Sequence, residues 1–81
     1  MGYIDKELGI KSVLGIQKYL TKHFKNHNLD VECVKVGHNV RCFWALDNKL
    51  HKFNLKSHVI YVLKTEDLDE LVNAINQTLP H

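Results

Sequence analysis

The chain has 81 residues, of which 44% are hydrophobic and 25% are charged, with four glycines and one proline. This length suits one domain and is too short for two. The composition is that of a globular chain, and no apolar run approaches the roughly 18 residues that span a bilayer. We therefore expect a single small domain over residues 1–81, in which residues 1–9 could form a loosely ordered N-terminal arm.

The N-terminus carries no recognisable targeting signal. Asp5 and Glu7 precede any hydrophobic stretch, unlike the start of a secretory signal peptide, and Lys6 stands where myristoylation needs Ser or Thr. The two cysteines, Cys33 and Cys42, are too few for a disulfide framework, and we expect them to be thiols packed as small hydrophobic groups. These features predict a cytoplasmic protein without a membrane anchor.

Charge is distributed unevenly along the chain. Residues 1–64 contain all 11 Lys and Arg residues and five acids, whereas residues 65–81 contain four acids and no base. The body therefore has a net charge of +6 and the C-terminal segment a net charge of −4. A basic body indicates an acidic partner, either a nucleic acid or a protein surface.

A helical pattern extends from about Ile10 to His27. Its apolar residues form one stripe, made of Ile10, Val13, Leu14, Ile16, Leu20 and Phe24. Its lysines form a second stripe on the opposite side, made of Lys11, Lys18, Lys22 and Lys25. Solvated helix faces commonly carry lysines, so this stripe is a secondary candidate for a binding surface. We expect the helix to end within residues 26–28, where Asn can adopt the left-handed capping conformation.

Four short runs rich in β-branched and aromatic residues follow, and they predict four strands. They are Leu29–Val36, Val40–Leu46, Leu50–Leu55 and His58–Leu63. The third run could instead merge with the fourth around a bulge. Asp47-Asn48 suits a two-residue hairpin turn, because both residues tolerate positive φ.

The last segment predicts a second amphipathic helix. Thr65 is expected to be its N-cap, and Glu66 and Asp67 complement the positive end of the helix dipole. Its apolar residues are Leu68, Leu71, Val72, Ile75 and Leu79. The predicted fold class is thus α+β, with the order α-β-β-β-β-α: an antiparallel β-meander with two amphipathic helices packed on one face.

The hairpin at Asp47-Asn48 separates two sheet faces. The expected core face carries Cys33, Cys42, Trp44, Leu46 and Phe53. The other face carries Arg41, Phe43, Ala45, Leu50, Lys52 and Asn54, joined by Val34 and Val36 if the preceding turn is centred on His38-Asn39. Cations that neutralise phosphates beside an aromatic ring that stacks on a base are typical of nucleic-acid binding. The alternatives are a solvated face with an incidental Phe, or Phe43 in the core with Trp44 outside.

Other chemistry has little support in the sequence. His23 and His27 are four residues apart and are weak candidates for a metal pair, but no spacing supplies a third ligand. We find no phosphate loop, nucleophile elbow or Cys-x-x-Cys pair. We therefore predict no catalysis, no cofactor and no metal.

Three families resemble the chain in layout alone. The element order is similar to that of double-stranded RNA-binding domains, but acids from Glu66 to Glu70 stand where that family places phosphate-gripping lysines. Residues 59–79, a strand running into Thr65-Glu66-Asp67-Leu68, resemble the strand-to-helix ending of LAGLIDADG homing endonucleases without their acidic catalytic motif. The helix-and-hairpin layout also resembles saddle-sheet DNA-binding modules of phage transcription regulators.

The leading hypothesis is a non-catalytic module that binds nucleic acid, DNA rather than RNA, through a basic and aromatic sheet face. The residues predicted to bind nucleic acid or another partner are Lys35, Arg41, Phe43, Lys52 and Lys56. The alternative is a protein-interaction module, such as a small phage- or plasmid-encoded inhibitor or an accessory regulator. Homodimerisation is compatible with both hypotheses.

Overall fold

Two tight turns fold the middle of the chain into one antiparallel sheet with the order β1-β2-β3. The computed structural model describes residues 2–80, and its strands are β1 (Val31–Val36), β2 (Asn39–Leu46) and β3 (Lys49–Leu55). Asp47 and Asn48 both have positive φ (51° and 65°), which confirms the two-residue turn between β2 and β3. The predicted pairing of the two strands is also confirmed, with Trp44 opposite His51 and Cys42 opposite Phe53.

The turn between β1 and β2 is centred on Gly37-His38, one residue before the centre considered from the sequence. Gly37 adopts a φ of 63°, a conformation that costs a glycine little. Val34 lies opposite Arg41, so Val34 and Val36 still share a face with Arg41, as predicted.

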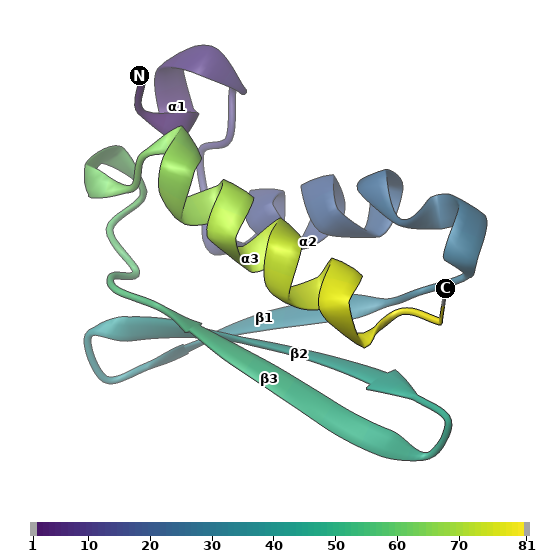
Figure 1. The fold of residues 1–81 in the computed structure, drawn as a ribbon. Coiled ribbons are helices and arrows are strands. Elements are labelled where there is room, and N and C mark those ends of the chain that lie inside the picture. Colours follow the sequence, from purple (N-terminus) through teal and green to yellow (C-terminus); the bar gives the residue numbers. More distant parts are fainter. Residues whose placement is uncertain (1, 81) are drawn as a thin grey trace.

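Both longer helices lie on the same face of the sheet, which confirms the predicted α+β architecture (Figure 1). They are α2 (Val13–His23) and α3 (Thr65–Thr78). Between the two layers lies a core of buried hydrophobic residues, and no polar or charged residue within residues 2–80 is buried. The helices contribute Ile16, Leu20, Leu68, Leu71 and Ile75, the C-cap of α2 contributes Phe24, and the sheet contributes Val31, Cys33, Val40, Cys42, Trp44 and Leu55.

The prediction of a fourth strand over His58–Leu63 is wrong. Within residues 2–80 the sheet has three strands, and the segment instead contains a 3-10 turn, Ile60–Val62. Its backbone bonds locally, since Val62 N–H donates to Val59 O and Leu63 N–H to Ile60 O. Burial accounts for part of the apolar character of this run: Leu63 lies in the core and Ile60 packs against it, whereas Tyr61 and Val62 are exposed.

The first predicted helix is shorter than its periodic pattern. Ser12 caps α2 by accepting a hydrogen bond from Gly15 N–H (3.2 Å), and the α-helix ends at His23. A 3-10 turn, Lys25–His27, follows, and Asn28 has a φ of 51°, which confirms the predicted left-handed cap. The assignment of Leu14 to the buried stripe is wrong, since 55% of its surface is exposed.

The N-terminal segment, considered as a loosely ordered arm, contains the short helix α1 (Ile4–Glu7). Ile4 is buried in the core, and its N–H donates to Leu63 O (3.1 Å). Thr65 N–H donates to Gly2 O (2.9 Å), so this segment supplies backbone partners to the chain just before α3.

The start of α3 also differs by one residue from the prediction. Its N-cap is Lys64, and Thr65 is the first helical residue. The Asp67 carboxylate accepts the backbone N–H of Lys64 (2.8 Å) and lies 3.4 Å from Lys56 Nζ. None of the helices within residues 2–80 has the length and apolar character needed to cross a bilayer.

Candidate functional site

The sheet face opposite α2 and α3 is covered by no element within residues 2–80 (Figure 1). Because side chains alternate along a strand, the register assigns ten residues to this face. We call them the open face: Glu32, Val34, Val36, Asn39, Arg41, Phe43, Ala45, Leu50, Lys52 and Asn54.

Three of the predicted binding residues lie next to one another on β2 and β3 of the open face. Phe43 on β2 is directly opposite Lys52 on β3, and Arg41 is opposite Asn54. Arg41 Nε donates a hydrogen bond to Asn54 Oδ1 (3.1 Å), which holds the guanidinium over the sheet. Arg41, Lys52 and Asn54 help to line a shallow hollow of about 230 Å³. The arrangement offers two cations beside a half-buried aromatic ring.

The other two predicted binding residues are not part of this group. Lys35 shares its face with Cys33, on the helix side of the sheet, because side chains alternate along β1. Lys56 lies beyond the end of β3 and forms an ion pair with Asp67 of α3. Among the described residues, the open face therefore carries two cations, Arg41 and Lys52, and one acid, Glu32.

Much of the open face is apolar. Leu50 is 64% exposed, and Val34 and Val36 are 44% and 40% exposed. Phe43 and Ala45 complete the apolar set. Exposed apolar side chains that share one face of a sheet are typical of an interaction surface.

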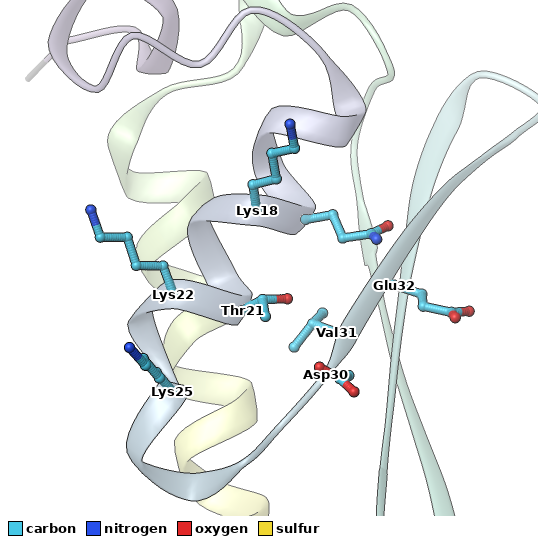
Figure 2. Close-up of a pocket in the computed structure, with 8 residues that line it drawn as sticks. Lys18, Thr21, Lys22, Lys25, Asp30, Val31 and Glu32 are labelled. Carbon is cyan, nitrogen blue, oxygen red and sulfur yellow. The ribbon is translucent and has the colours of Figure 1, made fainter.

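A second surface lies where α2 passes the outer edge of β1. A groove of about 610 Å³ is lined there by Gln17, Lys18, Thr21, Lys22, Lys25, Asp30, Val31 and Glu32. Figure 2 shows Lys18 and Lys22 on α2, Lys25 just beyond its C-terminal end, and Thr21 pointing from the helix toward Val31. The side chains of Lys22 and Lys25 extend away from β1 in this view. Glu32 points away from α2 in the same view. We call this the α2–β1 groove.

The secondary lysine stripe lies along this groove and its continuation. Lys18, Lys22 and Lys25 line the groove itself. Lys11 and Lys35 line a neighbouring hollow of about 450 Å³ at the start of α2. The structure thus places Lys35 with Lys11, just before α2, rather than with Arg41.

The two candidate metal ligands do not share one α-helical face. α2 ends at His23, and His27 lies in the following 3-10 turn. Both imidazoles lie near the Phe24 ring, at centroid distances of 4.8 Å for His23 and 6.4 Å for His27. Within residues 2–80, no three His, Cys, Asp or Glu side chains are close enough together to hold a metal ion.

The two cysteines are opposite each other on β1 and β2 and are buried, as predicted. Their Sγ atoms are 3.3 Å apart. The hydrogen bond with Cys33, together with burial in apolar surroundings, raises the pKa of Cys42 far above its ordinary range. Cys42 is therefore a neutral thiol at physiological pH and a poor nucleophile.

The chain matches no family model, no curated protein and no solved structure.

Sequence reasoning missed the strand side of the α2–β1 groove, formed by Asp30, Val31 and Glu32. One signal could have indicated it: the first strand of a meander lies at a sheet edge, and here a helix with a lysine stripe directly precedes it. Gln17 Oε1 accepts the Cys33 N–H of β1 (3.1 Å). This contact had no such signal, because a single polar residue beside an apolar stripe is common.

Proposed function

We propose that this chain is a non-catalytic module that binds a partner protein through its open face. The observation that supports the proposal is the uncovered sheet, on which exposed Val34, Val36 and Leu50 share one surface with Arg41 and Phe43. Protein interfaces are enriched in aromatic residues and Arg, and burial of exposed apolar area favours association.

The cations of the open face favour a partner surface that carries carboxylates. Arg41 lies on the central strand β2, and Phe43 of the same strand is flanked by Lys52 of β3 on one side and Glu32 of β1 on the other. A partner surface with apolar side chains around one or two carboxylates would match this arrangement, and Arg is well suited to pair with a carboxylate.

Nucleic-acid binding is the second candidate, and the adjacency of Arg41, Phe43 and Lys52 favours it. Cations flanking an aromatic ring on a sheet could neutralise phosphates and stack on a base, and DNA remains the expected nucleic acid. We rank this function second because Lys35 and Lys56 do not add their charge to the open face.

Two double variants separate the candidates. The apolar variant is Val36→Thr with Leu50→Thr, which keeps good strand formers, and the charge variant is Arg41→Glu with Lys52→Glu. The control variant, Lys6→Glu with Lys64→Glu, reverses two exposed lysines away from both surfaces. Circular dichroism first checks that each variant is folded.

The readouts are protein capture from nuclease-treated extract and fluorescence anisotropy with labelled single- and double-stranded DNA and RNA. If the proposal is right, a discrete set of proteins is retained by wild type and control but lost by the apolar variant. Nucleic-acid binding that persists at roughly 150 mM salt and is lost in the charge variant would establish the second candidate instead.

Three further expectations belong to this proposal. The cytoplasmic location, the role as a small regulator or inhibitor, and homodimerisation each stay predictions. Light scattering over a concentration series tests the last, because a second copy is one partner that the open face could bind.

A further inference from the structure

One row of residues across the open face carries an acid at one end and a base at the other. Glu32 on β1 is opposite Phe43 on β2, and Phe43 is in turn opposite Lys52 on β3. Both charged side chains are exposed, and the ring between them is half-buried. Within residues 2–80 the one ion pair joins Lys56 to Asp67, so neither Glu32 nor Lys52 is paired inside the chain.

This row is complementary to itself under one particular symmetry. When two copies of the sheet pack face to face about a two-fold axis that runs along β2, β1 of each copy lies over β3 of the other. Glu32 of each copy then faces Lys52 of the other. An axis that ran across the strands would instead set Glu32 against Glu32 and Lys52 against Lys52, and like charges in contact oppose association. The row therefore selects the axis along β2.

The same axis brings apolar residues of β2 together. Phe43 and Ala45 lie on the open face of the central strand, so each is placed close to its own counterpart in the second copy. A pair of aromatic rings stabilises an interface beyond the area that it buries, and the small Ala45 side chain leaves room for close approach. Isologous two-fold interfaces of this kind are the commonest among soluble oligomers.

Arg41 also lies on β2, but its side chain is held to one side of the strand. Its Nε donates to Oδ1 of Asn54 on β3 at 3.1 Å. The two-fold axis places this β3 side on opposite sides of the interface in the two copies. The two guanidinium groups therefore do not face each other.

The size of the open face suits a weak dimer. Three strands about 4.8 Å apart and about 20 Å long make a patch of roughly 15 by 20 Å, and packed sheets lie about 10 Å apart, a gap that Lys and Glu side chains can bridge from the two sides. This patch is smaller than the roughly 800 Å² per partner of a standard interface. We expect a dissociation constant between about 10 μM and 1 mM.

We propose that the open face binds a second copy of this chain, forming a two-fold dimer in which Glu32 of each copy pairs with Lys52 of the other across the two Phe43 rings. The inference rests on the function proposed above, because it names the partner of the same surface. It adds the symmetry of the complex and the two ion pairs that specify it.

The test uses analytical ultracentrifugation of the full chain from about 10 μM to 1 mM, with circular dichroism to check folding. We expect the mean mass of the wild type to rise with concentration from 9.4 kDa towards twice that value. Glu32→Lys and Lys52→Glu, each alone, should weaken dimerisation at least about tenfold, because each sets like charges against each other twice.

The decisive sample is an equal mixture of these two single variants. In a mixed dimer every introduced charge meets its opposite, so dimerisation should return to the wild-type level. The double variant, Glu32→Lys with Lys52→Glu, should also dimerise like wild type. The matched controls are Glu70→Lys on α3 and Lys22→Glu on α2, which make the same changes in net charge at exposed positions outside the open face and should leave dimerisation unchanged.

Several outcomes would overturn the proposal. These are a wild type that stays monomeric at about 1 mM, a mixture that dimerises no better than its components, and equal losses in the controls. A monomeric wild type that still captures proteins from extract, with capture lost in the apolar variant, would overturn the dimer and leave the proposed function standing. Absence of both dimer and capture would remove the proposed function as well.

Discussion

Cys42 connects the packing of the core to the pH dependence of stability. Burial and the Cys33 hydrogen bond raise its pKa from an ordinary value of 9.0. The unfolded chain then loses this proton more readily than the folded chain. The stabilisation that the protonated Cys42 thiol gives to the folded chain is complete below pH 9 and is lost as the pH rises above 9.

We therefore predict that the free energy of unfolding falls above pH 9 by up to about 1.4 kcal/mol per pH unit from this group alone. Cys42→Ala is the comparison, because it removes the thiol while the other titrating groups remain. The difference in stability between wild type and variant should shrink as pH rises from 8 to 10 in urea denaturation. A difference that stays constant with pH would contradict the assignment.

Trp44 shows how one side chain links the sheet to the last helix. Its ring is buried, and Nε1–H donates to Thr78 Oγ1 (2.8 Å), whose hydroxyl in turn donates to Ile75 O (2.7 Å). The indole ring also stacks on His51 at a centroid distance of 5.8 Å.

Thr78→Val should destabilise the fold by about 1–2 kcal/mol, because the shape is kept while the Trp44 N–H loses its acceptor. Thr78→Ser keeps the hydroxyl and should cost clearly less. Chemical denaturation followed by tryptophan fluorescence measures both. Equal losses in the two variants would mean that the methyl group, not the hydrogen bond, matters at this position.

At the scale of elements, Gln17 joins α2 to the edge of β1. Gln17→Ala should destabilise the fold by about 1 kcal/mol, since the Cys33 N–H is left without its partner. Gln17→Glu retains an acceptor oxygen and should preserve slow hydrogen exchange at the Cys33 amide, which NMR can follow. Rapid exchange of this amide already in the wild-type chain would contradict the contact.

The elements that could be predicted from sequence are those whose local residue pattern is compatible with only one local structure. The hairpin at Asp47-Asn48 and the apolar stripe of α3 are examples, because turn residues and helical spacing act locally. The run His58–Leu63 has the composition of a strand, but its burial comes from contacts with Ile4 and the core. Such long-range contacts leave no local signal.

The same distinction applies to the candidate site. Arg41, Phe43 and Lys52 could be placed together because alternation along a hairpin follows from the turn alone. Lys56 could not, since its ion pair with Asp67 depends on where α3 packs. The side of β1 that holds Lys35 follows from the same alternation, since Cys33 is expected on the core face and Val34 and Val36 on the other. Only the packing of α2 beside β1 required the tertiary fold.

At the scale of the whole molecule, the helices fill one face of a three-stranded sheet and leave the other face to a partner (Figure 1). In a small domain the buried fraction of the surface is low, so covering an exposed sheet adds stability as well as specificity. Arg41 and Lys52 lie on the open face, and Lys18, Lys22 and Lys25 line the α2–β1 groove, which gives the molecule two surfaces of different chemistry.

The most direct test of the central claim is site-specific photo-crosslinking in cells that express the chain. A photoreactive phenylalanine analogue at Leu50 probes the open face, and the same residue at Asn73 probes the exposed side of α3. The account predicts a discrete, nuclease-resistant protein adduct from position 50 that is absent from position 73. Adducts that are absent from position 50, or identical at both positions, would contradict it.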